Sequence, residues 1–301
     1  MPLAEFKIAE RDEIFSLHRQ AFAPFNLSEH LWQPCRQIES LEKNCPRFVW
    51  KDRKIGGFAA AYALDKTHFR FNLLVAPESS FQIAASLLEK IEVEIKSKGA
   101  KYLQFRLLEG MENYLRFAFS NGFEEIHRMR GMSLAARDFS FEKWKPLGAK
   151  LAAKDFVPTT LEAELNSQKN PIENLVKLHR SAQKGWESPD PTWKIRPPDA
   201  FYKSLFEAVS VPELFSIMKN GGQFVAYTSA ERKNQTGTAV HPNFRNLGAA
   251  TFLKAENLKM CIAAGANYFE TCTASRSMQR VNEKLGYKYN NLTEIRLLKR
   301  L

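Results

Sequence analysis

Apolar side chains recur along this chain at two spacings, one typical of amphipathic helices and one typical of strands. A helical spacing covers Glu13–Phe22 and again Pro171–Ala182, where Leu175, Leu178 and Ala182 share one helix face. After each helix come two apolar runs separated by a polar turn, which predicts a strand pair. The two pairs are Phe48–Trp50 with Ile55–Ala63 around Lys51–Lys54, and Leu214–Met218 with Gln223–Ser229 around Lys219–Gly222.

The two halves of the chain repeat the same landmarks at a nearly constant distance. A Val-x-Pro, a Gly-Ala and a glycine before an aromatic residue recur at offsets of 165, 166 and 164 residues: Pro77 and Pro242, Gly99 and Gly265, Gly122 and Gly286. Chance rarely keeps such spacing over three landmarks, so the sequence predicts a tandem of two related domains. We place these domains at residues 1–145 and 160–301.

Within each predicted domain, strands alternate with helices. The strand pair is followed by a strand ending in Val-x-Pro, a helix, a strand, a short helix and a last strand. This order predicts an α/β (mixed α+β) fold. In each domain a mixed sheet of parallel and antiparallel strands would be flanked by helices on both faces. The connection between the domains is expected within Phe139–Thr160, which contains Pro146, Gly148 and Pro158 but no clear periodicity.

Composition narrows the class of protein. The 301 residues are 44% hydrophobic and 26% charged, as in ordinary globular proteins, and no apolar run approaches the roughly 18 residues of a membrane span. The first residues carry acids where a signal peptide has a basic and then an apolar stretch, so we expect a cytoplasmic protein that binds no membrane. The net charge of +11 is spread without a basic run or a nucleic-acid motif. This distribution argues against nucleic acid as a partner and favours small anions.

The cysteines carry no sign of a metal site. Cys35, Cys45, Cys261 and Cys272 form no Cys-x-x-Cys pair, and no histidine cluster lies near them at zinc spacing. We therefore expect reduced thiols and no metal. Cys272 lies near the site predicted below and is retained as a candidate nucleophile.

The segment from Thr236 to Ala250 passes from a strand through a tight turn into a helix expected over Ala249–Ala263. The turn has the pattern Arg245-x-x-Gly248-x-Ala. Glycine lets an anion approach the backbone, the first turn of the helix offers N–H groups without intrahelical partners, and arginine suits the same anion. The sequence therefore predicts a pyrophosphate-binding turn.

A second motif runs from Thr271 to Tyr287 and ends in Glu-Lys-Leu-Gly-Tyr. Together the two motifs resemble the GNAT N-acyltransferase superfamily, closely over Thr236–Tyr287 and loosely over the rest of each domain, and tandem-domain members of the superfamily have a similar layout. The resemblance implies a splayed central strand pair in the sheet and acetyl-CoA as cosubstrate. It also implies direct attack of an amine on the thioester, without a covalent enzyme intermediate.

The resemblance further implies roles for particular residues. The backbone of Thr238, Ala239 and Val240 would pair with the pantetheine arm, and the thioester would lie between this strand and Asn267–Thr271. The other residues that would hold the cofactor are Arg245, Asn246, Leu247, Gly248, Ala249, Ala250, Ser275 and Asn282.

Two positions depart from the pattern of the superfamily. Asn282 stands where many members have a tyrosine that protonates the leaving thiolate, and Ser275 stands where asparagine is common. We expect Asn282 to orient the sulfur or a water, because an amide cannot give up its proton at useful pH. The strand Gln235–Val240 carries no carboxylate or histidine, so Glu231 and His241 are the nearest candidates for a general base.

The first domain lacks the residues of the turn. Alignment of the two Val-x-Pro motifs sets Ser80 against Arg245 and Ile83 against Gly248. Serine supplies no positive charge, and a β-branched side chain would block the approach of a phosphate. We therefore expect the first domain to be degenerate and the chain to bind one acyl-CoA, in the second domain.

The acceptor is indicated only by a loop that follows the first helix of the second domain. Its tryptophans and acids suit a cation-bearing ligand, and they equally suit a proline-stiffened loop packed on its own domain. The candidate substrate-binding residues are Trp186, Glu187, Asp190 and Trp193.

These features predict an N-acetyltransferase that acts on a primary amine of a small molecule or peptide. Two alternatives stay open. A catalytically weak acyl-CoA-binding sensor or interaction module is favoured by the missing tyrosine and base. A transferase of larger acyl groups, or of aminoacyl groups from tRNA, is compatible with the positive net charge. The oligomeric state does not follow from the sequence.

Overall fold

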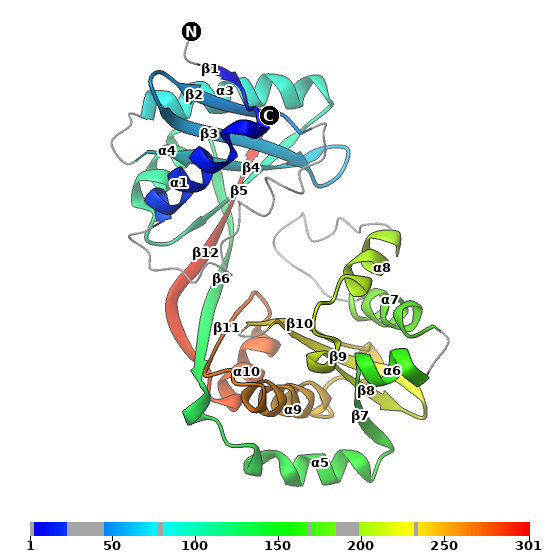
Figure 1. Ribbon diagram of the computed structural model, residues 1–301. Coiled ribbons are helices and arrows are strands. Elements are labelled where there is room, and N and C mark those ends of the chain that lie inside the picture. The colour runs from blue at the N-terminus through cyan, green and yellow to red at the C-terminus, as the bar shows by residue number, and fades with distance from the viewer. Residues whose placement is uncertain (1–2, 23–44, 77–80, 168–169, 185–198, 232–233) are drawn as a thin grey trace. The chain divides into compact units, whose positions relative to one another are not determined.

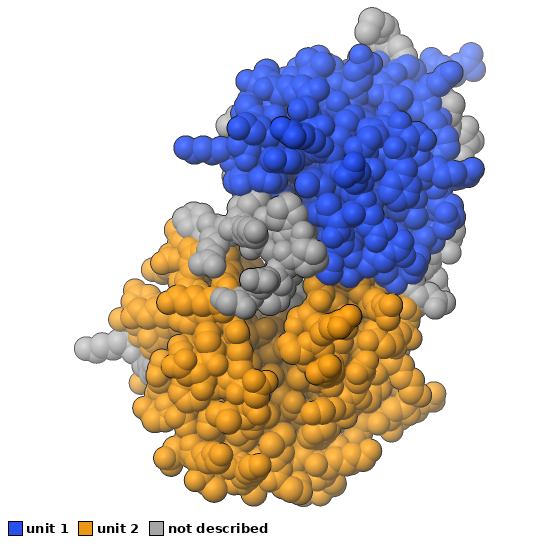
Figure 2. Space-filling view, turned by 180° about the vertical axis from the view of Figure 1, so that it is seen from behind, with its two compact units in different colours: residues 1–128, 189–195, 293–301 blue, residues 129–188, 196–292 orange. Residues whose placement is uncertain are grey.

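The computed structural model of the protein describes residues 3–22, 45–76, 81–167, 170–184, 199–231 and 234–301 (Figure 1). These residues form two compact units, coloured separately in Figure 2. The described residues of unit 1 fall within 1–128 and 293–301, and those of unit 2 fall within 129–292.

Unit 1 is a mixed sheet with helices on its faces. Its strands are ordered β1-β2-β3-β4-β5-β12, with β4 parallel to β5 and the other neighbours antiparallel. Its elements are β1 (Leu3–Glu5), α1 (Arg11–Phe22), β2 (Arg47–Lys51), β3 (Ile55–Ala63), β4 (His68–Val75), α3 (Phe81–Ser97), β5 (Tyr102–Leu108), α4 (Glu112–Ser120) and part of β12 (Lys288–Arg300).

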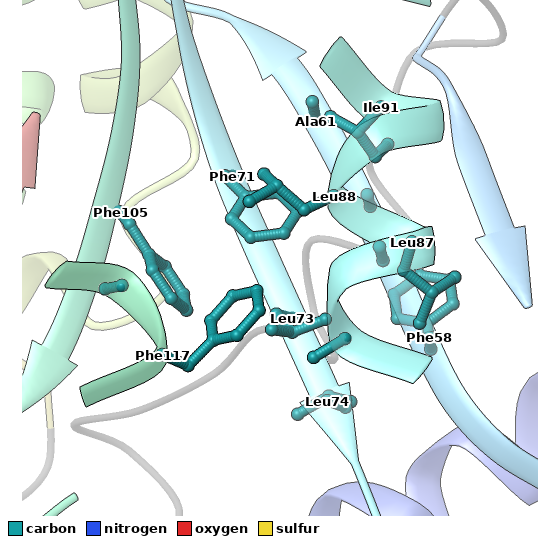
Figure 3. Close-up of a cluster of buried hydrophobic side chains, with 14 of the residues drawn as sticks. Phe58, Ala61, Phe71, Leu73, Leu74, Leu87, Leu88, Ile91, Phe105 and Phe117 are labelled. Atoms are coloured by element: carbon teal, nitrogen blue, oxygen red, sulfur yellow. The ribbon is translucent and has the colours of Figure 1, made fainter. Parts of the chain in front are cut away.

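The core of unit 1 lies between this sheet and its helices. Phe71 and Phe105, from the parallel strands, and Phe117, from α4, gather beside the apolar face of α3 that carries Leu88 (Figure 3). Helix α3 packs closely on β3, because Gly57 has no side chain there. Burial of these large apolar groups is the main favourable term for the unit.

Unit 2 repeats the same order of elements with additions. Its strands are ordered β6-β11-β10-β9-β8-β7, and β10 is parallel to β11. Its elements are β6 (Glu124–Ala135, which begins in unit 1), α5 (Lys145–Ala152), β7 (Phe156–Thr160), α6 (Leu161–Ser167), α7 (Pro171–Ala182), α8 (Asp199–Glu207), β8 (Ser216–Asn220), β9 (Gln223–Glu231), β10 (Asn234–Val240), α9 (Ala249–Ala263), β11 (Tyr268–Thr273) and α10 (Arg276–Leu285).

The last strand of each repeat completes the sheet of the other unit. In unit 1, Glu294–Arg300 of β12 pair antiparallel with β5, and in unit 2, Arg130–Ala135 of β6 pair antiparallel with β11. The two compact units do not coincide with the stretches 1–145 and 160–301, whose assignment as related domains stays a prediction. The mixed α/β fold predicted from the sequence is confirmed.

The expected linker is itself structured. Phe139–Thr160 contains α5 and β7, and β7 pairs with β8 as the edge strand of unit 2. Leu151 and Phe156 are buried in one cluster with Phe252 and Leu253 of α9. Helix α9 is consequently covered by α5 as well as by the sheet, so it is buried on several sides rather than along a single stripe.

Candidate functional site

The parallel strands of unit 2 separate where the resemblance places the thioester. β10 meets β11 at Asn234 opposite Glu270, whereas β10 stays paired with β9 as far as Val240. A bulge between Gln235 and Gly237 accompanies the separation. Beyond Asn234 the described part of β10 therefore has no ladder partner on its β11 side.

Backbone groups of β10 point to this unpaired side of the strand. The N–H of His241 donates to the carbonyl of Val225 on β9 at 2.8 Å. Because neighbouring residues of a strand present their N–H and C=O groups to opposite sides, Thr238 and Val240 present theirs toward the β11 side. These groups lie where an extended arm of a ligand would find hydrogen-bond partners.

The turn between β10 and α9 is built for close backbone approach. Asn246 and Gly248 both have positive φ, 63° and 91°. A Cβ on Gly248 would lie 2.9 Å from Cδ1 of Leu147 on α5, so a side chain is excluded there by both backbone strain and space. Helix α9 starts at the next residue, and its first N–H groups and positive dipole end meet this turn.

The side chain of Arg245 ties this turn to its surroundings. Its Nη2 donates to the carbonyl of Ala182, at the end of α7, at 2.7 Å, and its Nε donates to the carbonyl of Val240 at 3.4 Å. The guanidinium thus holds the end of β10 against α7. Leu247 is 39% exposed, whereas Ala249 at the start of α9 is buried.

Helix α10 carries the two positions that depart from the superfamily. Asn282 is fully buried, with Nδ2 3.9 Å from Sδ of Met132, and its Oδ1 has no hydrogen-bond partner among the described residues. Ser275 caps α10 by accepting the N–H of Met278 at 3.4 Å. An orphaned buried carbonyl oxygen costs about 1–3 kcal/mol, which a ligand that donates to it would recover.

The other sequence candidates are placed less favourably or lie beyond the described part. His241 uses Nδ1 to accept the N–H of Asn243 at 3.3 Å. Glu231 ends β9, and its side chain lies outside the described residues. Cys272 on β11 has Sγ 3.5 Å from the carbonyl of Met129. The loop residues Trp186, Glu187, Asp190 and Trp193 lie outside the described residues.

A hydrogen-bonded cluster that the sequence did not indicate lies under α7 and α8. The Tyr227 hydroxyl on β9 is 2.6 Å from Nδ1 of His179. Nε2 of His179 is 3.0 Å from the amide nitrogen of Gln183, which also donates to the Tyr202 hydroxyl at 3.0 Å. Burial, and after it the neighbouring Arg180, lowers the pKa of His179 below its ordinary 6.5, so the imidazole is neutral at pH 7.

This cluster reaches β10 at Gly237. A Cβ on Gly237 would lie 3.4 Å from Oγ of Ser229 and 4.0 Å from Cε2 of Tyr227, so the tyrosine ring borders the strand where it leaves β11. The one available sequence signal was that His179 lies on the predicted helix Pro171–Ala182, next to its apolar face, and that Gln183 follows the end of this helix four residues later.

A second residue missed by the sequence analysis is Glu270. It is 9% exposed and lies opposite Asn234, where the strands separate. Phe269 beside it belongs to the apolar cluster under α9, so strand alternation turns Glu270 to the opposite face of the sheet. The sequence feature that could have indicated Glu270 is an acidic residue within the apolar pattern of a central strand.

The corresponding position in unit 1 is closed. The Tyr114 hydroxyl on α4 accepts the N–H of Val75 at 3.0 Å and donates to its carbonyl at 3.3 Å, so it occupies the backbone that matches Val240. Ile83 already lies within α3, and its Cγ2 would be 2.8 Å from a Cβ on Gly57. Ser80 lies outside the described residues.

Two general features concern only the part of the chain that the structure describes. No three His, Cys, Asp or Glu side chains gather there as a metal site would require. None of its helices combines the length and the apolar character needed to cross a membrane.

Comparison with known proteins identifies the fold. No protein-family model and no curated protein matches this sequence. The structure is similar to a GCN5-related N-acetyltransferase from Sphaerobacter thermophilus, at 13% identity and a TM-score of 0.74, covering 99% of this chain and 95% of that one. It is also similar to a tandem GNAT protein from the clavulanic acid biosynthesis pathway, at 14% identity and a TM-score of 0.69, over 99% and 98% of the two chains. An acetyltransferase of the GNAT family from Colwellia psychrerythraea matches at 11% identity and a TM-score of 0.62, over the full length of both chains.

Proposed function

We propose that this chain, which has the GNAT fold, is an N-acyltransferase whose unit 2 moves an acetyl group from acetyl-CoA to a primary amine of a small molecule or peptide. The observation that carries the proposal is the separation of β10 from β11 beyond Asn234, beside a glycine turn at the start of α9. An extended arm along β10 and a pyrophosphate at the turn would use both features, as added strands and anions at helix starts do elsewhere.

The residues of this region fit the cofactor. Backbone groups of Thr238 and Val240 would pair with the pantetheine, and the N–H groups from Asn246 to Ala250 would hold the pyrophosphate. Arg245 would fix the turn rather than grip the phosphate, because its guanidinium is engaged with two carbonyls. Asn282, buried on α10, would orient the sulfur by donating from its amide Nδ2–H groups.

The chemistry would be a direct displacement. The amine nitrogen attacks the thioester carbon, the C–N bond forms, and the C–S bond breaks to release a thiolate. A thiol of pKa about 8.5 is a tolerable leaving group, so the missing tyrosine is no obstacle and water can supply its proton. The amine proton would pass through the Tyr227 hydroxyl to Nδ1 of His179, which is neutral and 2.6 Å away. Glu231 and His241 remain candidates for the same task, with His241 limited by its bond to Asn243.

The cofactor site is tested with a matched pair of glycine variants. Gly248→Ala and Gly265→Ala both place a side chain at positive φ, 91° and 89°, at a cost of about 1–2 kcal/mol each. A Cβ on Gly248 would push against Leu147 of α5 and so shift the start of α9, whereas nothing lies within 4 Å of a Cβ on Gly265. Acetyl-CoA at about a hundred times its Kd should stabilise the wild-type protein and Gly265→Ala by about 2.7 kcal/mol, and Gly248→Ala much less. Equal stabilisation of the two variants would refute the cofactor assignment.

Catalysis is separated from mere binding by a second assay. Release of free CoA from acetyl-CoA should rise with one member of a panel of polyamines, aminoglycosides, amino acids and peptides. Cofactor-dependent stabilisation with no release across the panel would identify a sensor or interaction module instead.

A further inference from the structure

Helix α5 belongs to the segment that the sequence predicted as a linker, yet it packs against the start of α9 (Figure 1). A Cβ on Gly248 would lie 2.9 Å from Cδ1 of Leu147, and a Cβ on Gly148 would lie 2.5 Å from Cε2 of Phe252. Gly248 directly precedes α9, and Phe252 lies one helical turn later. Leu147 and Gly148 therefore place α5 directly beside the turn that leads into α9.

Lys150 lies on the flank of α5 that continues from this contact toward the turn. Successive helix residues are about 100° apart, so Gly148 and Leu151 lie on one flank of Leu147. Lys150 lies on the other flank. Gly148 faces Phe252, and Leu151 is buried in the same cluster as Phe252, so their flank covers the body of α9. The flank with Lys150 consequently points past the start of α9, toward the turn.

The ammonium group of Lys150 can reach an anion bound at the turn. Long side chains on a helix lean over the preceding turn, so Lys150 leans toward Leu147, whose Cβ is about 5–6 Å away on the helix surface. Lys150 is exposed, and no carboxylate pairs with it among the described residues. The acid just before α5, Glu142, pairs instead with Lys145 at 2.8 Å.

The turn gains from a cation of this kind because its own arginine is engaged elsewhere. Arg245 donates from Nη2 to the carbonyl of Ala182 at 2.7 Å and from Nε to the carbonyl of Val240 at 3.4 Å. The start of α9 supplies backbone N–H groups and a positive dipole end of only about half an elementary charge. A pyrophosphate carries more negative charge than that, so a neighbouring ammonium would bind it more tightly.

We propose that Lys150 binds the pyrophosphate of the acyl donor, so that α5 forms one wall of the donor site. This inference rests on the proposed function of unit 2 and adds a choice of donor to it. An acyl group carried on coenzyme A meets Lys150 through its phosphates, whereas the same group on pantetheine alone does not. Lysine binds phosphate as a point charge on a flexible stem, which suits an exposed position beside backbone N–H groups.

Calorimetric titration with acetyl-CoA tests the role of Lys150. Lys150→Gln should raise the Kd about tenfold, because a hydrogen bond between two charged groups is lost. Lys150→Arg should keep most of the affinity, because it keeps the charge. The matched control is Lys203→Gln on α8, which removes an exposed lysine 3.9 Å from Glu207 and should leave the Kd unchanged.

A measurement on the wild-type protein avoids any misfolding of the variants. Bound CoA should slow the reaction of Lys150 with an amine-reactive reagent, because an ammonium beside a phosphate stays protonated. The reaction of Lys203 should not change, and pantetheine, which has no phosphate, should not protect Lys150. Mass spectrometry measures the modification of each lysine.

The outcomes separate this inference from the function on which it rests. If the wild-type protein binds acetyl-CoA but Lys150→Gln and Lys203→Gln have equal Kd values, Lys150 does not bind the donor and only this inference fails. Protection of Lys150 by pantetheine as strong as that by CoA would also overturn it. Absence of acetyl-CoA binding by the wild-type protein would overturn both the inference and the proposed function.

Discussion

At the scale of single residues, Lys254 is a cation buried in the core of unit 2. It lies on α9, is 2% exposed, and has Nζ 5.8 Å from the ring centroid of Tyr287. Burial lowers the pKa of Lys254 from 10.5 to about 7. Below about pH 7 both folded and unfolded states are charged and the burial cost is complete, whereas above 10.5 both are neutral and the cost is gone.

The consequence is a rise in stability between about pH 7 and 10.5, because the unfolded state binds more protons in that window. Lys254→Met should raise the free energy of unfolding at pH 7 by an amount on the order of a few kcal/mol and flatten the rise. Lys259→Met, on the exposed side of the same helix, should leave this rise of stability with pH unchanged. Urea unfolding at several pH values measures the free energy of unfolding of each variant. If the free energy of unfolding rises with pH in Lys254→Met as it does in the wild type, another group causes the rise.

His179 makes a second prediction at this scale, for activity rather than stability. A proton acceptor must be neutral, so kcat/KM should fall as the pH drops through a pKa below 6.5. His179→Gln should lose about 10²–10⁴-fold in kcat/KM and lose this acidic limb, and Tyr227→Phe should reduce activity in the same direction. His241→Gln should stay within a few-fold of wild type. An acidic limb that persists in His179→Gln would assign the proton to another residue.

At the scale of elements, β12 is fixed to unit 1 by a buried ion cluster as well as by its ladder. Burial alone would raise the pKa of Glu294, but Arg106 and Arg296 outweigh it and bring the pKa to about 2. The carboxylate thus contributes stability above pH 4.5 that is lost as the pH falls through about 2.

Glu294→Gln should therefore destabilise unit 1 by about 3 kcal/mol at pH 7, because the buried Arg296 and the half-buried Arg106 lose this carboxylate. Glu109→Gln removes an exposed partner of Arg128 and should cost under about 1 kcal/mol. Hydrogen exchange of the β5 and β12 amides measures the stability of unit 1 in both variants. The stability difference between wild type and Glu294→Gln should shrink near pH 2. Equal losses of stability in the two variants at pH 7 would contradict the role of the cluster.

At the scale of the whole molecule, two repeats of one architecture have become unequal. In unit 2, β10 pairs with β11 only at Asn234, whereas in unit 1 Tyr114 occupies the matching backbone at Val75 and α3 begins before Ile83. We expect one acyl-CoA per chain. Calorimetric titration should give a stoichiometry of one for wild type and for Tyr114→Phe, because Ile83, which aligns with Gly248, still lies within α3. Two equivalent sites in the wild-type protein would show that unit 1 is also competent.

The sequence by itself determined the local helices and strands and the position of the glycine turn before α9. Helices α7 and α9 begin and end where periodicity and turn residues placed them, because those signals act over a few residues. The Arg245-x-x-Gly248 turn was recognisable for the same reason, because a positive φ and the start of a helix each favour particular residues at particular positions. The fold followed from the alternation of such elements.

Only the tertiary structure decided which segments meet. Alternation along a strand tells which face is buried but not which strand lies beside it, so the pairing of β12 with β5 and of β6 with β11 left no local signal. The same holds for Arg245 on the end of α7, for the burial of Asn282 against Met132, and for His179 beside Tyr227. Each joins residues far apart in the chain, and such contacts depend on packing geometry that composition and spacing do not encode.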